Sequence, residues 1–468
     1  MNRSPAAKTW SRLQHWRHRL TVPQFTAVTG LLVIAAGTVV LASPLCSTDD
    51  VGLWEALFTV TSAITVTGLS IIDVSRDLTA IGQITLAALI MVGGLGLMAI
   101  TTFLQGFVQG RSGLRHRLDK GRALDEFGVG GIGPTFHRIL LTASCLIGLG
   151  TVILFCFGFQ DIQSPVARLW ASLFHCISAY NNAGFGLWAD NLVGYRFNPV
   201  VCGVIGTLIV LGGIGWRVTN DLLQFKPSLR RLRQLSLHTR LVLRSTALLI
   251  AIGTLGLLFT EQFSSDGVIQ KLSLIQRLQV TIFQSITTRT AGFNTVPLSI
   301  ETISDAGLLL MILLMFIGAS PGGTGGGIKT TTFAMLMGAT RSTLQGRDGV
   351  VIRNRLIPDA VVFKAVGTAL ASAIFVVVMT LLLGICEVSG GKTSDGVFSF
   401  LENLFTCMSA FGTVGLDLGV TAHLGRLSQL VLMVSMFVGR LGILLVLSAI
   451  YGSRPPSRIG YPREEVYL

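Results

Sequence analysis

The fold is indicated by one short stretch, Arg289-Thr290-Ala291-Gly292-Phe293, and by three related stretches elsewhere in the chain. Each has a glycine in fourth place followed by a bulky apolar residue, and the four glycines are 116, 108 and 123 residues apart. A repeat at a nearly constant distance indicates one structural unit used several times. The other three stretches are Thr65-Val66-Thr67-Gly68-Leu69, Asn181-Asn182-Ala183-Gly184-Phe185 and Gly412-Thr413-Val414-Gly415-Leu416.

The residues around these motifs keep a common register. Phe58, Phe174 and Phe405 each precede their motif glycine by ten residues. A second glycine follows each motif glycine by 24 to 28 residues, inside the next apolar segment, at Gly93, Gly212, Gly318 and Gly439. The predicted unit is therefore a helix, a short half-helix, a loop that ends in glycine, and a second helix.

The composition excludes a soluble protein. Of 468 residues, 50% are hydrophobic and 13% charged, and the mean hydropathy is +0.67, whereas a soluble domain carries about 25% charged residues. Such a chain satisfies its backbone hydrogen bonds as helices in a bilayer, each of about 20 residues. Eight crossings are predicted near Pro23–Leu41, Thr79–Leu104, Phe136–Phe157, Pro199–Leu222, Leu237–Phe259, Ala306–Met337 (interrupted), Asp359–Ile385 and Leu427–Tyr451.

Basic residues are concentrated in alternate loops. Segments 1–20, 105–138, 224–244, 341–364 and 452–468 hold 25 of the 36 lysines and arginines, whereas the segments on the opposite side hold 8. The positive-inside rule then predicts that the first set, with both termini, is cytoplasmic. The net charge of +13 is accordingly interpreted as topology and contact with membrane lipid, and nucleic-acid binding is not expected.

The glycine-terminated loops suit a pore for a dehydrated cation. A potassium ion that leaves water needs several oxygen ligands at once, and backbone carbonyls supply them without fixed charge. Carbonyls converge on one axis only where the backbone adopts conformations that glycine tolerates. Irregular backbone at membrane depth is acceptable where it lines such a pore. A potassium filter is therefore predicted from residues 65–68, 181–184, 289–292 and 412–415.

Catalytic and metal-binding patterns are absent from the sequence. The seven cysteines are scattered without a C-x-x-C pair, and the apolar helices contain no HExxH, no serine–histidine set and no paired carboxylates. The segment Gly318–Lys329 is not a Walker A phosphate loop, because Ile328 separates Gly327 from the lysine. The chain is therefore predicted to be no enzyme and to bind no cofactor of its own.

Two basic residues lie within apolar segments. An unpaired arginine in a bilayer costs about 2.5–3.5 kcal/mol, so Arg440 is predicted to face the pore and to donate to carbonyls of the glycine-rich segment. The alternative is an arginine that reaches out from a helix end. Lys329 either reaches toward the cytoplasm or lines an inner cavity, and the sequence leaves both alternatives open. The glycine-rich segment contains Gly318, Gly322, Gly323, Thr324, Gly325, Gly326 and Gly327.

Three further charged residues adjoin the predicted filter. Arg289 would repel a cation if it pointed inward, so it is expected to point away and to pair with a carboxylate. Glu55 and Glu402 each stand thirteen residues before a motif glycine, at the start of a half-helix. They are interpreted as caps of those half-helices, or else as residues that concentrate cations at the pore entrance.

These motifs resemble those of the Trk/Ktr/HKT superfamily of potassium transporters over essentially the whole chain. Within it the sequence is most similar to the bacterial KtrB membrane subunits, because the first helix leads directly to the first loop without the N-terminal hairpin of the TrkH branch. The tail Tyr461-Pro462-Arg463-Glu464-Glu465 also resembles that of the KtrB subunits. The matching stretches are SAITVTGL, NNAGF, TTRTAGFNT, SAFGTVGL, PGGTGGGIKTTTF and GRLG.

The resemblance implies an all-α polytopic membrane protein with eight transmembrane helices and four re-entrant pore helices around one pore. It implies potassium uptake across the plasma (inner) membrane, with sodium as an activating or coupling ion. It also implies a homodimer on a cytoplasmic ring of KtrA-like regulatory subunits that bind ATP or ADP. The glycine-rich segment would be an intramembrane gate, together with Lys329 and Arg440. A TrkH-like or sodium-permeable transporter is the alternative; a serine at the first filter glycine is associated with sodium permeability, so Gly68 favours potassium.

The predicted organisation follows the four repeats. Cytoplasmic tails are expected at each end of the chain, and the gating loop interrupts the third repeat. The boundaries are 1–22 for the N-terminal tail, 23–110, 134–225, 236–342 and 358–452 for the repeats, 318–327 for the gating loop, and 453–468 for the C-terminal tail.

Overall fold

The structure is a computed structural model, and nearly all of its regular structure is helical. It describes residues 22–48, 51–96, 132–223, 235–263, 267–347, 349–352, 355–389 and 398–451. In these ranges the only paired strands are the antiparallel two-residue strands β1 (Val351–Ile352) and β2 (Arg355–Leu356). Residues 1–21 and 453–468 of the predicted tails, and residues 97–110 of the first predicted repeat, lie outside the described residues.

The helices follow the predicted segments in order. In the first half they are α2 (Val22–Leu41), α3 (Leu53–Thr65), α4 (Ala80–Met91) with the π-turn η1 (Val92–Gly96), α7 (Ile132–Ile153) with η2 (Leu154–Gly158), α8 (Pro165–Asn181), the short η3 (Val193–Tyr195), α9 (Pro199–Ile214) and α10 (Trp216–Leu223). In the second half they are α11 (Leu237–Gln262), α12 (Leu274–Thr287), α13 (Asp305–Phe316), α14 (Thr330–Leu344), α15 (Asp359–Ser389), α16 (Phe400–Gly412), η6 (Thr421–His423), α17 (Arg426–Leu441) and α18 (Ile443–Tyr451).

Four described helices are long and apolar enough to cross a membrane. They span Pro23–Leu41, Phe136–Gly158, Leu237–Gln262 and Asp359–Val388. Two bent pairs, α9 with α10 and α17 with α18, raise the number to six if each pair is one span. The prediction of a helical chain with several membrane spans is confirmed at this level.

Two predicted crossings are not the continuous helices that the sequence suggested. The stretch Pro199–Leu222 bends by 106° after Ile214, and Leu427–Tyr451 bends by 98° after Leu441. The residues at the two breaks, Gly215 and Gly442, both have φ of 87°, outside the range of a right-handed helix. Hydropathy alone does not register such a break, because glycine interrupts the backbone without adding polarity.

The predicted interruption of the sixth crossing is confirmed, since α13 ends at Phe316 and α14 begins at Thr330. The second predicted crossing is described as α4 and η1 as far as Gly96.

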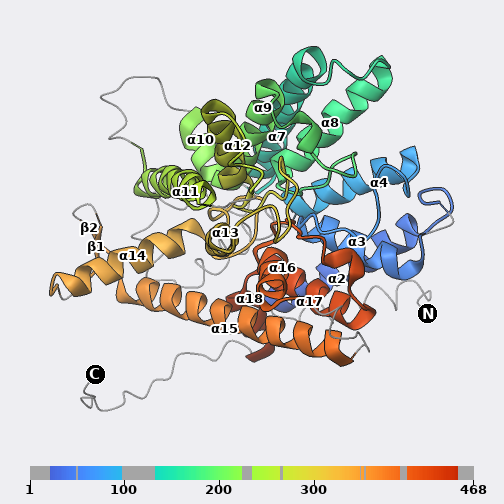
Figure 1. The fold of residues 1–468 in the computed structure, drawn as a ribbon. Helices are drawn as coiled ribbons and strands as arrows, with labels where there is room; N and C mark the ends of the chain where they lie inside the picture. The colour runs from blue at the N-terminus through green and yellow to red at the C-terminus, as the bar shows by residue number, and fades with distance from the viewer. Residues whose placement is uncertain are drawn as a thin grey trace, which may run out of the picture.

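The helices pack in a sequence that closes on itself. Helix α4 contacts α8, α9 contacts α12, α13 contacts α16, and α17 contacts α3. Figure 1 shows the result: the red C-terminal helices lie beside the blue N-terminal helices around a common centre. Phe58, Phe174 and Phe405, which share a register in the sequence, are all fully buried. These phenylalanines anchor the half-helices α3, α8 and α16 in the core.

Candidate functional site

The loops that follow the four half-helices share a residue with positive φ at the same position. Val66, Asn182, Thr290 and Thr413 each stand two residues before a motif glycine, and their φ angles are 56°, 60°, 76° and 49°. Among the described residues only Asn191 is a further non-glycine residue with positive φ. This conformation is costly for β-branched residues such as Val66 and tends to occur at functional sites. A strained turn repeated four times indicates that the loops have one shared task.

The four motif glycines meet in a closed ring, here called the glycine ring (Gly68, Gly184, Gly292 and Gly415). A methyl group added to any of them would come closer than 3.0 Å to a carbonyl oxygen of the next loop, a distance that real Cβ atoms essentially never show. The oxygens concerned belong to Ala183 for Gly68, Ala291 for Gly184, Val414 for Gly292 and Thr67 for Gly415. Each loop therefore contacts the next, and the fourth returns to the first.

The N–H groups of these loops bond back to their own half-helices. Thr67, Ala183 and Val414 donate their N–H to carbonyls five residues earlier, at 2.8 Å in all three cases. The hydroxyls of Ser62 and Ser409 accept from the N–H groups of Gly68 and Gly415 at 3.0 and 3.1 Å.

The carbonyl oxygens of Thr67, Ala183, Ala291 and Val414 accept no hydrogen bond from any described residue. Buried carbonyls are nearly always paired, so four unpaired ones beside the glycine ring are available to ligate a cation.

A second set of glycines lets the half-helices approach closely. Methyl groups added to Gly93, Gly212 and Gly439 would overlap the carbonyl oxygens of Ile64, Tyr180 and Phe411. Each of those carbonyls stands four residues before a ring glycine. The common register of the second glycines thus reflects backbone contact between a helix and the neighbouring half-helix.

The glycine-rich segment between α13 and α14, here called the glycine loop (318–327), lies against the same turns. Gly326 donates its N–H to Thr413 Oγ1 at 2.9 Å, and Thr324 Oγ1 donates to the carbonyl of Tyr180 at 3.2 Å. A methyl group on Gly325 would overlap Thr290 Oγ1. The structure therefore brings together the residues predicted for the filter and those predicted for the gate.

The glycine loop is also tied to the break between α9 and α10. Ser320 N–H donates to Gly213 O at 2.9 Å, and Thr324 N–H donates to Gly212 O at 3.1 Å.

The contacts of Arg440 differ from the prediction. Its Nη2 donates to the carbonyls of Gly93 at 2.7 Å and Gly94 at 3.4 Å, in the π-turn that follows α4. The prediction that Arg440 donates hydrogen bonds to the glycine loop is therefore wrong. The π-turn leaves carbonyl groups without their usual helical partners, and a buried guanidinium is a strong donor to them.

Lys329 makes the contact that was predicted for Arg440. It precedes α14, and its Nζ donates to the Gly325 carbonyl at 2.9 Å. It also lines a cavity of about 170 Å³ with residues of α15, α17 and α18. Of the two alternatives, the structure favours a position that lines a cavity.

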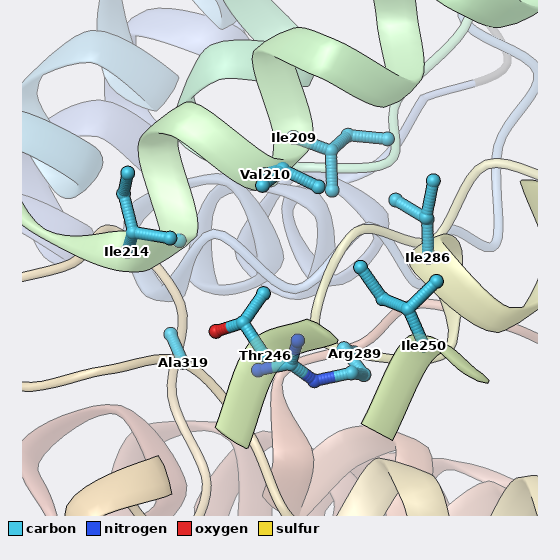
Figure 2. A pocket seen from close by; sticks show the side chains of 9 residues that line it. Ile209, Val210, Ile214, Thr246, Ile250, Ile286, Arg289 and Ala319 are labelled. Carbon is cyan, nitrogen blue, oxygen red and sulfur yellow. The ribbon is translucent and has the colours of Figure 1, made fainter. Parts of the chain in front are cut away.

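The contacts of Arg289 also differ from the prediction, which gave it a carboxylate partner. Its side chain lines a cavity between α9, α11 and the glycine loop (Figure 2), and none of the ring glycines lines that cavity. It has no carboxylate partner in the part of the chain that the structure describes. Nη2 donates instead to the carbonyl of Gly318 at 3.3 Å.

The two predicted glutamate caps differ. Glu402 forms a capping box with Ser399, accepting from its N–H at 2.7 Å. The N-cap residue of α3 is Gly52, without a side-chain cap, so Glu55 lacks this geometry.

Several residues of the site were not predicted from the sequence. The four positive-φ residues are not all of one residue type. In the sequence they share only their position two residues before a ring glycine. Asn191, whose Nδ2 donates to Gly184 O at 3.1 Å, lies seven residues from its partner with no motif. The partners of Arg440 are more than 340 residues away in the chain.

The fold and the sequence match known transport proteins. The TrkH family, described as "Cation transport protein", matches residues 6–452. Ktr system potassium uptake protein B of Bacillus subtilis is 35% identical over 96% of this chain and 97% of its own. Ktr system potassium uptake protein B of Vibrio alginolyticus is 32% identical over 95% of this chain and 94% of its own. The potassium/sodium uptake protein NtpJ of Enterococcus hirae is 31% identical over 97% of this chain and 98% of its own.

A solved structure supports the same fold. The potassium transporter TrkH of Vibrio parahaemolyticus has a TM-score of 0.69, with 18% identity over 92% of this chain and 84% of that one. The resemblance to the Trk/Ktr/HKT superfamily and to its KtrB branch is confirmed by these matches, and so is the expectation that the chain is a multi-pass membrane protein and not an enzyme. The match over nearly the whole chain establishes that it belongs to the TrkH family of cation transport proteins.

Proposed function

We propose that this chain takes up potassium through a pore whose filter is the glycine ring. The observation that carries the proposal is the set of four unpaired carbonyls beside a closed ring of four glycines. Such a ring replaces the hydration shell of a weakly hydrated monovalent cation. Two relatives above 30% identity are named potassium uptake proteins, which supports this choice of ion.

The four motifs belong to four units that share one pore. The cyclic contacts between helices and neighbouring half-helices support this arrangement. Eight crossings result if the bent pairs α9–α10 and α17–α18, the interrupted pair α13–α14, and α4 with η1 are counted beside the four long helices. Both termini then lie on the cytoplasmic side, as the distribution of 25 and 8 basic residues favours.

The glycine loop is the gate of this pore. It lies against the turns that support the glycine ring and is held there by Thr413, Tyr180 and Lys329. A loop rich in glycine can change conformation at little steric cost. The hydrogen bonds around it support the interpretation that the structure represents a closed gate.

Control of the gate belongs to other subunits. The sequence contains no nucleotide-binding motif, and its basic loops face the predicted cytoplasmic side. A KtrA-like ring that binds ATP or ADP would dock on those loops of a homodimer, and sodium would activate or accompany uptake. The relatives named as parts of a Ktr system support such a partner.

The experiment for this function is uptake in a bacterium that lacks its own potassium transporters. The chain is expressed with and without a KtrA-type subunit, and with and without sodium. Growth at low potassium that requires the chain supports the proposal. Sodium uptake that potassium does not inhibit would favour the sodium-permeable alternative, which is suggested by the similarity to the potassium/sodium uptake protein NtpJ.

Arg440 should limit cation flux through its charge. We expect Arg440→Met to raise potassium flux by roughly tenfold, which corresponds to about 1.4 kcal/mol of barrier, because it removes a buried positive charge close to the filter. Arg440→Lys is the control, since it keeps the charge while losing the guanidinium geometry. Flux is measured in proteoliposomes and normalised to folded protein. Lower flux in well-folded Arg440→Met would assign Arg440 a structural role alone.

A further inference from the structure

A small cavity lies behind the third ring loop. It is bordered by α9, α11, the end of α12 and the start of the glycine loop, and its volume is about 20 Å³, more than the roughly 10–15 Å³ that one water molecule requires. Most of its lining is apolar, with six aliphatic side chains. Figure 2 shows the two polar side chains among them, Arg289 and Thr246.

Both polar side chains have unused hydrogen-bonding atoms. Arg289 Nε and Thr246 Oγ1 have no partner, although the two residues are only 9% and 6% exposed. Among the described residues, the one side-chain hydrogen bond of Arg289 is donated by Nη2 to the Gly318 carbonyl, which carries no net charge. A buried arginine thus keeps an unneutralised charge next to a cavity with a second free donor.

This combination is unfavourable unless something occupies the cavity. A buried charge is normally paired, and a buried donor without a partner costs about 1–3 kcal/mol. A water molecule would accept from Arg289 Nε and Thr246 Oγ1 but leave the charge uncompensated. A small monovalent anion accepts both bonds and also neutralises the guanidinium.

We propose that this cavity binds a halide-sized anion, chloride under physiological conditions, between Arg289 and Thr246. Arg289 stands three residues before Gly292, and its other end bonds to the first residue of the glycine loop. A bound anion would fix the guanidinium and hence hold both segments in place. It would also reduce the repulsion of a cation in the ring by Arg289.

Bromide replaces chloride in such a site and is located by anomalous X-ray diffraction. The protein is purified and crystallised in potassium bromide. An anomalous peak within hydrogen-bonding distance of Arg289 Nε and Thr246 Oγ1 is the expected result. Density at the level of water without anomalous signal would overturn the proposal and assign the cavity to a water molecule.

Variants test the two donors separately. Thr246→Val keeps the shape and removes one donor, so bromide occupancy should fall severalfold; Arg289→Gln removes the charge and should abolish it. Thr254→Val is the matched control, because Thr254 is also buried on α11 with an unpartnered Oγ1 but does not line the cavity. Equal bromide occupancy in all variants would contradict the proposal, and Thr246→Val keeps the test valid if Arg289→Gln does not fold.

Thermal stability gives a second readout that does not involve transport. The wild type should melt about 2–4 °C higher in chloride than in gluconate, which is too large for the cavity. Thr246→Val should lose this difference and Thr254→Val should keep it. The readouts are independent of the transported cation, so a failed potassium-uptake experiment leaves them interpretable, and an empty cavity leaves the proposed function standing.

Discussion

Gly415→Ala is expected to lower potassium flux by roughly tenfold to a hundredfold. The added methyl group would overlap the carbonyl oxygen of Thr67 in the neighbouring loop, so one loop must shift and the carbonyls around the ring lose their common geometry. A displacement that costs about 1–3 kcal/mol in the barrier produces a change of this size. Potassium flux is measured in proteoliposomes with equal amounts of folded protein.

Gly419→Ala provides the matched control. Gly419 lies four residues further on, and its φ of 83° is close to the 89° of Gly415, yet no atom lies within 4 Å of its added methyl group. Both variants suffer the same backbone strain, and only Gly415→Ala disturbs the ring. We expect Gly419→Ala to lose some stability and keep its flux. Equal loss of flux in both would attribute the effect to strain alone and contradict the filter proposal.

The sequence predicted the elements of the site because each repeat carries its own signal. The motif glycines and the second glycines are constrained by close backbone contacts that leave no room for a side chain, and the phenylalanines ten residues before three of the motif glycines are fully buried. A constraint that recurs four times in one chain is visible without a comparison of homologues. The glycine loop was equally visible, since six glycines and a proline interrupt an apolar segment.

The contacts of the charged residues were not predictable in the same way. Arg289 and Arg440 each occur in one repeat only, so no recurring pattern marks their role. Both bond to backbone carbonyls, which every residue has, and the sequence therefore does not indicate which carbonyl is the partner. A carboxylate was expected beside Arg289 because buried charges are normally paired, yet the described chain supplies only the Gly318 carbonyl. For Arg440, only the π-turn after α4 explains why Gly93 and Gly94 accept its bonds.

The bends at Gly215 and Gly442 were missed for a related reason. Hydropathy averages over a window of residues and is insensitive to backbone direction. Each of these two glycines is the second glycine of a G-x-x-G pair, and the first glycines of the pairs are Gly212 and Gly439. That spacing was a usable signal: the first glycine contacts a half-helix and the second ends the helix.

Shortening the glycine loop is expected to raise potassium flux by about tenfold or more. Deletion of Gly323–Gly325 removes the part of the loop that contacts Tyr180 and Thr290. The two ends of the loop are already joined, because Gly318 N–H donates to the carbonyl of Ile328 at 2.9 Å. The deletion can therefore close without moving α13 or α14. Flux without the regulatory subunit is the quantity to measure.

Thr413→Val tests the same gate without changing the length of the loop. It removes the acceptor of the Gly326 N–H, a bond worth about 0.5–1.5 kcal/mol, so the ratio of closed to open gates should fall roughly 2- to 13-fold. Thr343→Val on α14 is the control, since its hydroxyl is exposed and bonds only within its own helix.

The two changes together should give little more than the deletion alone, because they act on one element. Additive effects would indicate that Thr413 acts on the filter and not on the gate. Unchanged flux in the correctly folded deletion variant would exclude the glycine loop as the obstruction, and the path would then have to be closed elsewhere.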